Sequence, residues 1–88
     1  MVEKENLPLY PIRTVARLTG INDRTLRSWE SKYGLVKPAR TRGGHRLYSE
    51  NDIKIIREIK EMVYGEGMSI TGVEKIFSQR EGSDYEKR

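Results

Sequence analysis

Apolar side chains recur every three or four residues in four stretches of the chain, a spacing that places them on one face of a helix. Segments containing glycine, proline or serine separate these stretches and interrupt the pattern. The pattern predicts helices over four ranges: residues 11–18, 22–33, 49–64 and 69–79. The first two are short and lie only a few residues apart, which is typical of a helix-turn-helix unit.

Residues at the ends of these stretches support the same boundaries. Pro11 suits the first position of a helix, where its missing N–H costs nothing. Asn22 is placed to cap the second helix, and Gly34 to end it with a left-handed residue. Ser49 and Asp52 have the spacing of a capping box, in which side chain and backbone bond reciprocally at a helix start.

Residues 39–48 follow a different pattern. The adjacent Gly43 and Gly44 indicate a turn between two short segments. Side chains alternate after the turn, so that Arg46 and Tyr48 share one face of a strand. This segment predicts a two-stranded hairpin with a basic tip.

Together these elements predict a mostly α-helical fold: a winged helix-turn-helix with a two-stranded hairpin wing and a following helix pair. Residues 1–9 are polar without a regular period, and we expect a flexible arm there. Residues 10–80 form the one domain that 88 residues allow. The polar residues 81–88 are expected to be a disordered tail.

Positive charge is concentrated in the first half of this domain. The whole chain has a formal net charge of +4, but residues 13–48 hold nine Lys and Arg side chains against two acidic ones. Acidic side chains outnumber basic ones from residue 49 onward. A polyanion such as nucleic acid is the expected partner, because each neutralised phosphate releases counterions. The alternative is a basic face that is merely solvated.

The composition argues against several kinds of chemistry. There is no cysteine, which excludes disulfides, thiolate metal sites and cysteine nucleophiles, and His45 is the single histidine. No phosphate-binding loop and no pair of acids in an apolar setting is present, so we expect neither enzyme activity nor a cofactor or metal. No apolar run approaches the roughly 18 residues of a membrane span, and we expect a cytoplasmic protein without membrane contact.

Two arginines of the second helix are the principal candidate contacts. Arg24 lies near the helix N-terminus, the end that enters the major groove, and is assigned to base edges. Arg27 lies one turn further on and is assigned to phosphate. The alternative for either arginine is a surface ion pair with Asp23 or Glu30. The aromatic pair at residues 29 and 33 is assigned to the core rather than to base stacking.

The hairpin provides the second group of candidates. Its glycine tip can approach a sugar–phosphate wall, and its basic side chains can reach the minor groove or phosphates. Tyr48 can donate its hydroxyl group to a phosphate, or can instead pack on the third helix. The complete set of candidate DNA-binding residues is Arg17, Arg24, Arg27, Arg40, Arg42, His45, Arg46 and Tyr48.

Several short motifs resemble the MerR family of bacterial transcription regulators. They are YPIRTVA at residues 10–16, GI at 20–21, TLRSWE at 25–30, PART at 38–41 and GHRLYS at 44–49. Residues 52–53 and 67–70 continue a match that spans about residues 9–77. The resemblance implies a winged helix-turn-helix followed by a helix pair, in a dimer that binds an inverted repeat and often distorts promoter DNA between the half-sites.

The resemblance also assigns residues. Family DNA contacts correspond to Arg27, Arg46 and Tyr48, with Arg17 and Arg24 as neighbours. The family's usual tyrosine pair after that arginine is replaced here by serine and tryptophan, so a tyrosine contact with phosphate is not carried over to these positions. The motifs look closest to the light- or cobalamin-responsive branch, and repressors of heat-shock or nitrogen genes are also similar.

Two family features are missing from this sequence. No long heptad helix follows Phe77 to form the usual antiparallel dimer seam, and there is no effector domain. Metal sensing is not carried over, because the metal-sensing members use cysteines. The chain is either the DNA-binding fragment of a longer regulator or a small stand-alone member, and we expect a homodimer or larger oligomer in the full regulator.

The sequence therefore predicts a sequence-specific regulator of transcription, a repressor that binds double-stranded DNA. Residues 22–33 would read the major groove, and residues 39–48 would grip the minor groove or phosphates. One alternative is an architectural module similar to excisionase-type winged helices, which bend DNA and assemble cooperatively on direct repeats. Another is a protein-interaction domain whose basic face meets an acidic partner.

Overall fold

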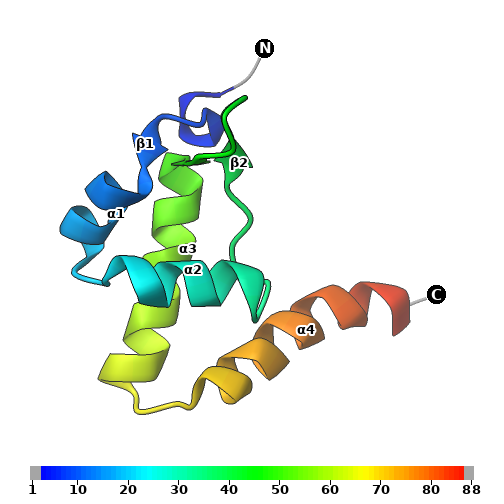
Figure 1. Cartoon of the computed structure of the whole chain (residues 1–88). Coiled ribbons are helices and arrows are strands. Elements are labelled where there is room, and N and C mark those ends of the chain that lie inside the picture. The colour runs from blue at the N-terminus through cyan, green and yellow to red at the C-terminus, as the bar shows by residue number, and fades with distance from the viewer. Residues whose placement is uncertain (1–2, 87–88) are drawn as a thin grey trace.

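A small antiparallel sheet lies at one end of the central helix in this fold (Figure 1). The computed structural model describes residues 3–86, and the side chains of residues 3–80. The elements are a 3-10 helix η1 (Lys4–Asn6), β1 (Tyr10–Pro11), α1 (Ile12–Thr19), α2 (Asp23–Ser31), β2 (Ala39–Arg40), β3 (Arg46–Tyr48), α3 (Glu50–Lys60), a π-helical turn η2 (Glu61–Gly65) and α4 (Ile70–Glu86). Figure 1 shows α1 and α2 beside α3, with the sheet at one end of α3 and α4 leading away from the other. The mostly helical winged helix-turn-helix that the sequence predicts is confirmed.

The helix-turn-helix is built by the end signals that the sequence contains. α1 ends at Gly20, whose φ of 77° is in the left-handed region that favours glycine. α2 then starts at Asn22, whose side chain accepts a hydrogen bond of 2.8 Å from the backbone N–H of Thr25. Gly34, with φ of 62°, follows the end of α2 as predicted.

α3 begins with the predicted capping box. The Ser49 hydroxyl accepts from the Asp52 N–H at 3.0 Å, and the Asp52 carboxylate accepts from the Ser49 N–H at 2.9 Å. Both groups would otherwise be left without partners at the helix start. The α-helical geometry ends at Lys60, and the chain continues to Gly65 as the π-helical turn η2.

The sheet has one strand more than the predicted hairpin. Its order is β1-β3-β2, and both pairings are antiparallel. Tyr10 pairs with Tyr48 and Pro11 with Leu47, so Pro11 lies in an edge strand. It occupies the N-cap position of α1, without a side-chain capping bond, instead of forming the first residue of the helix. A strand of two residues is too short to show a period of two, and an edge strand tolerates proline.

The ends of the chain also differ from the sequence-based expectation. Residues 1–9 are expected to be a flexible arm, but Lys4–Asn6 form η1, and Lys4 lies 3.7 Å from the carboxylate of Glu50 in an exposed ion pair. The backbone N–H of Leu9 also donates to the carbonyl of Tyr48 at 3.0 Å. α4 continues to Glu86, into the range expected to be a disordered tail, since a single glycine such as Gly82 weakens a helix without ending it. Residues 1–2 and 87–88 lie outside the described range.

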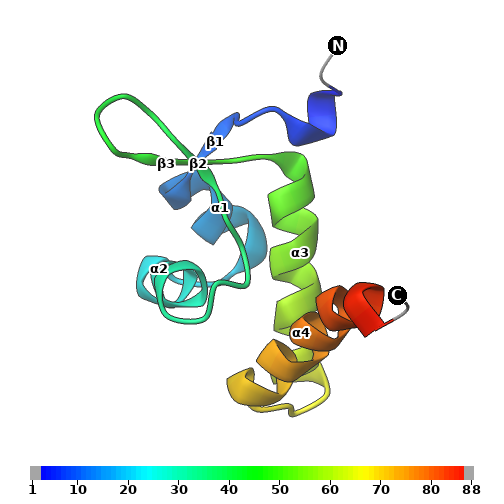
Figure 2. The same cartoon turned by 90° about the vertical axis from the view of Figure 1, so that its right-hand side faces the viewer.

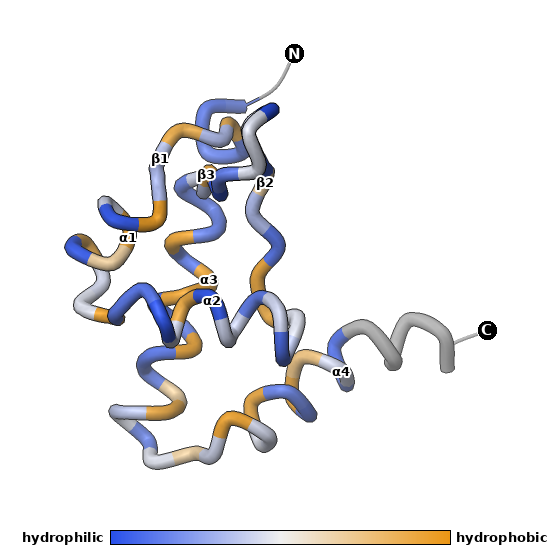
Figure 3. Tube along the Cα trace, in the orientation of Figure 1, coloured by the Kyte–Doolittle hydropathy of each residue, from blue (hydrophilic) through white to orange (hydrophobic). Residues whose placement is uncertain are grey.

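One hydrophobic cluster joins these elements. It contains Val15, Ile21, Leu26, Trp29, Leu35, Val36, Tyr48, Ile53, Ile56, Ile59, Met62 and Val73. Figure 3 shows hydrophobic positions alternating with hydrophilic ones along α3, as expected for a helix with one buried face. Trp29 is only 4% exposed, which confirms its assignment to the core. Within the described residues, none of the helices has the length and apolar character needed to cross a membrane.

Candidate nucleic-acid interface

α2 presents its basic side chains to solvent because its other side is buried. Leu26 and Trp29 point into the core, whereas Arg24 and Arg27 are exposed. Together with the residues at the start of α2, these two arginines line one open hollow on the surface. They are therefore neighbours on an accessible face, as the sequence predicts.

The two arginines differ in their contacts. The Arg27 guanidinium lies 3.7 Å from the Asp23 carboxylate, one turn earlier on the same helix. Both side chains are about half exposed, so this pair is worth only about 0.2–1 kcal/mol. The surface ion pair considered for Arg27 is thus present but easily exchanged. Among the described residues, Arg24 has neither a hydrogen bond nor an ion pair.

Contacts from α3 fix the turn that leads into α2. The Lys60 ammonium donates to the carbonyl of Thr19 at 2.7 Å, and the Arg57 guanidinium donates to the carbonyl of Leu18 at 3.3 Å. These carbonyls at the end of α1 lack partners inside the helix. No local sequence signal predicts either contact, because each joins residues about 40 positions apart. Arg17 is exposed in the last turn of α1.

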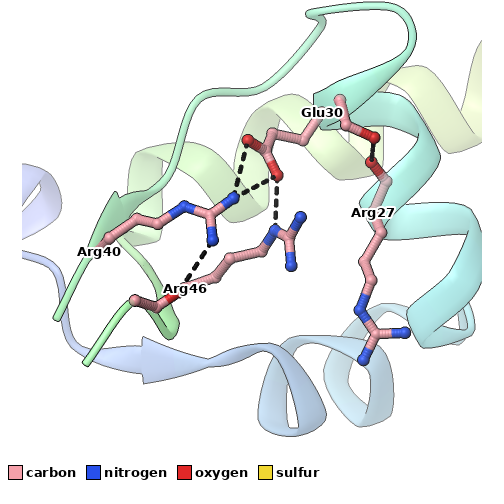
Figure 4. Close-up of polar contacts among 6 residues, drawn as sticks. Arg27, Glu30, Arg40 and Arg46 are labelled. Atoms are coloured by element: carbon pink, nitrogen blue, oxygen red, sulfur yellow. Dashed lines mark hydrogen bonds and ion pairs between the residues drawn. The ribbon is translucent and has the colours of Figure 1, made fainter.

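The wing is bound to α2 through one carboxylate. Arg40 and Arg46 are directly opposite each other on β2 and β3, and both reach toward Glu30 of α2, as Figure 4 shows. The Nε of Arg46 donates to Glu30 at 2.5 Å, and the Nη2 of Arg40 lies 3.4 Å from the other carboxylate oxygen. Arg40 also donates to the carbonyl of Gly44 at 2.8 Å. The Arg46–Glu30 pair is mostly buried, with 18% and 19% of the side chains exposed.

The electrostatics of Glu30 follow from these neighbours. Burial raises the pKa of the Glu30 carboxyl group, but the hydrogen bond and charge of Arg46, with those of Arg40, outweigh burial. The pKa of Glu30 therefore lies below its ordinary value. Glu30 is ionised at neutral pH and compensates the two arginines that the hairpin places opposite each other.

The tip of the wing is open to solvent. A backbone turn closes it, with the Thr41 N–H donating to the His45 carbonyl at 2.8 Å and the Gly44 N–H donating to the Thr41 carbonyl at 2.9 Å. Gly44 has a φ of 89°, a conformation that favours glycine. Arg42 and His45 are both exposed, and their side chains form no hydrogen bond or ion pair within the described residues. They remain available to a ligand.

Tyr48 lies inside the domain, contrary to its assignment as a phosphate contact. Its side chain is 0% exposed, whereas Arg46 and Leu47 before it on β3 are half-buried. Burial raises the pKa of Tyr48 to about 12. Its hydroxyl is buried without a hydrogen-bond partner among the described residues. Packing inside the domain, the alternative that the sequence left open, is what the structure contains.

α2 and the wing lie on the same side of the molecule. Figure 2 shows the loop between β2 and β3 projecting on the side of α2, with α3 and α4 on the other. The backbones of α2 and of the wing loop thus lie on one side of the fold, and Arg24, Arg27, Arg42 and His45 on these segments are exposed. Within the described residues no three His, Cys, Asp or Glu side chains are grouped so that they could hold a metal ion.

The sequence predicts Glu30 only as a possible partner of the α2 arginines and does not predict its contact with the wing. A two-residue turn at Gly43 and Gly44 would place Leu47 opposite Arg40, whereas the observed register is centred on Gly43 and places Arg46 there. Like charges at opposite positions destabilise a strand pair, so an acidic partner was required.

Comparison with known proteins agrees with this geometry. Residues 10–80 match the MerR HTH family of regulatory proteins. The chain is 47% identical over 72 residues to the HTH-type transcriptional regulator MlrA of Escherichia coli (strain K12), covering 82% of this chain and 29% of MlrA. It is 41% identical over 61 residues to the HTH-type transcriptional repressor CarA of Myxococcus xanthus, covering 68% of this chain and 21% of CarA.

A solved structure is similar as well. The crystal structure of a MerR family transcriptional regulator from Bacillus cereus aligns with a TM-score of 0.70 and 32% identity, over 81% of this chain and 52% of that one. The chain spans less than a third of MlrA and of CarA. On the match over residues 10–80, the chain belongs to the MerR family of helix-turn-helix transcription regulators, which bind DNA and are not enzymes.

Proposed function

We propose that this domain recognises a specific double-stranded DNA sequence by placing α2 in the major groove and the wing against the adjacent minor groove or phosphates. The observation that carries the proposal is the ion-pair cluster of Arg40, Arg46 and Glu30. It joins the wing to α2, so the spacing between the two basic groups is set before DNA binds. A fixed spacing allows both groups to contact one duplex together.

Within this arrangement the exposed arginines have separate roles. Arg24, near the start of α2 and without a partner among the described residues, reads base edges. Arg27 exchanges its weak pair with Asp23 for a phosphate. Arg42 and His45 at the wing tip contact the backbone or minor groove, and Arg17 in the last turn of α1 contacts a phosphate.

We further propose that the regulator acts as a repressor on an inverted repeat, in the bacterial cytoplasm. CarA, to which the chain is similar, is named a transcriptional repressor. One 88-residue domain binds a half-site weakly, and pairing of two copies would raise the affinity through effective concentration. Occupation of a promoter by such a pair would block transcription.

Selection of bound duplexes from a random pool with the 88-residue chain tests the proposal. We expect one discrete motif, and log affinity for it that falls with log salt by about 0.9 per phosphate contacted. Equal binding of all duplexes, or no dependence on salt, would overturn it. Footprinting then tests the arrangement: a bounded palindromic site supports the regulator, and protection that spreads head to tail supports the architectural alternative. If no duplex shifts at modest salt, the protein-interaction alternative is favoured.

A further inference from the structure

The wing of this domain contains an electrostatic conflict. Arg40 and Arg46 are cross-strand partners, with their side chains on the same face of the hairpin. Two like charges at directly opposite positions repel each other and destabilise the strand pair. The two strands are only two and three residues long, so few backbone hydrogen bonds oppose this repulsion. The hairpin needs a counter-ion on that face.

α2 supplies this counter-ion from the edge of its buried face. Glu30 lies one turn after Leu26 and next to Trp29, both of which pack into the core. This position holds the carboxylate beside the wing with only 19% of the side chain exposed. Figure 4 shows both wing guanidinium groups meeting there, while the Arg27 guanidinium lies apart from them.

The contact with Arg46 is directional. It uses the Nε of the guanidinium, and the described contacts with Glu30 leave the two terminal NH2 groups of Arg46 unengaged. A guanidinium donates through five N–H groups in a rigid plane, so fixing one of them fixes the direction of the others. Preorganised donors discriminate between ligands better than mobile ones, because no ordering entropy is lost on binding.

Resting on the proposed function, we propose that Glu30 is a positioning residue for DNA specificity: it joins β2 and β3 to α2 and holds Arg46 in a fixed direction for contact with the duplex. Glu30 bears the same charge as DNA and therefore opposes binding to any duplex. Glu30 should therefore raise the affinity for the correct site and lower the affinity for DNA of any other sequence. This difference separates a positioning role from simple charge.

The test compares two affinities of the full chain, for the duplex selected from the random pool and for a shuffled duplex of the same length and composition. With Glu30→Gln, we expect affinity for the selected duplex to fall about tenfold, the scale of one lost hydrogen bond to a charged group. Affinity for the shuffled duplex should rise about twofold to fivefold, because one negative charge is removed. The ratio between the two affinities therefore falls.

Asp23→Asn is the matched control, since it removes one carboxylate that pairs with an arginine on the same helix. It should raise both affinities together and leave their ratio unchanged. If Glu30→Gln behaves in the same way, Glu30 acts only through its charge and the proposal is overturned. Equal loss of both affinities would indicate damage to the fold and would also overturn it.

A double-mutant cycle tests whether Glu30 acts through Arg46. In an Arg46→Met background, Glu30→Gln should cause no further loss of the affinity ratio. A loss of the same size as in the natural background would contradict the proposal. Thermal unfolding of each variant sets a temperature at which all are folded. If the natural chain itself shows no preference for any duplex, the proposed function fails; if it does and only the ratio test fails, this inference alone is wrong.

Discussion

The arginines of α2 and those of the wing share a side of the molecule but not an environment. Arg27 is about half exposed and holds a loose pair with Asp23 at 3.7 Å. Arg46 has an exposed side-chain fraction of 18% and donates to Glu30 at 2.5 Å. The first kind of arginine is free to adapt to a ligand, and the second is already ordered.

This difference separates two sources of binding energy. A mobile exposed arginine gains a contact with DNA but loses side-chain freedom, up to about 2 kcal/mol for a fully ordered side chain. An arginine ordered in the folded protein has already undergone that loss. Substitutions on α2 should therefore change contacts, whereas substitutions around Glu30 should change the arrangement of the wing.

The largest expected effect on DNA binding comes from α2. Arg24→Ala should weaken binding to the selected duplex by about 1–3 kcal/mol and relax the base preference at one position, since it removes a base contact. Competition gel-shift assays with single-base variants of the duplex measure both effects. Lys75→Ala on α4 removes an equal charge away from the interface and is the control. If Lys75→Ala were the more harmful change, the assignment of α2 as the reading helix would be wrong.

A smaller effect, on stability, is expected beneath the wing. Tyr48→Phe removes a buried hydroxyl without a described partner, so the free energy of unfolding should rise by about 1 kcal/mol. DNA affinity should stay the same. Urea unfolding and a gel-shift titration measure the two quantities, with Tyr64→Phe, an exposed site, as the control. Loss of affinity in Tyr48→Phe would show that this hydroxyl reaches the duplex.

A pH titration sharpens the contrast at Glu30. The pKa of Glu30 is lower in the folded state than its ordinary value of 4.5. The stability that ionised Glu30 contributes is therefore fully present above pH 4.5. That contribution is lost as the pH falls through the lower folded pKa. The difference in melting temperature between the natural chain and Glu30→Gln should be constant near neutral pH and shrink below pH 4.5. A difference that persists unchanged in acid would contradict an ionised Glu30.

The smallest effect is expected at Arg40. Its side chain is 45% exposed, and its pair with Glu30 is longer than that of Arg46. Arg40→Ala should therefore lower the free energy of unfolding by only about 0.2–1 kcal/mol. Chemical denaturation of Arg40→Ala and Arg46→Ala, compared with the natural chain, measures the loss in free energy of unfolding for each. A larger loss for Arg40→Ala would reverse the proposed order of the two wing arginines.

What the sequence predicted correctly depends on local interactions. Asn22 caps α2 and Ser49 with Asp52 caps α3 because each acts within three residues of itself. Gly20 and Gly34 have the positive φ values expected of helix ends. The helices, the turn and the hairpin could be predicted for this reason.

The features that were not predicted depend on distant partners. β1 exists because Tyr10 and Pro11 pair with β3, almost 40 residues later. Glu30 meets Arg46 across 16 positions. The burial of Tyr48 depends on which face of the hairpin turns toward the core, and alternation along one strand leaves both faces possible. Such contacts are set by the packing of whole elements.

The central claim is that α2 and the wing tip contact one duplex together. Backbone amide spectra of the 15N-labelled chain, titrated with the selected duplex, test it residue by residue. We expect the large shift changes in residues 22–31 and 41–46 in the same titration step, with residues 70–80 of α4 unaffected. Changes centred on α4, or changes in α2 at a different duplex concentration from those in the wing, would contradict it.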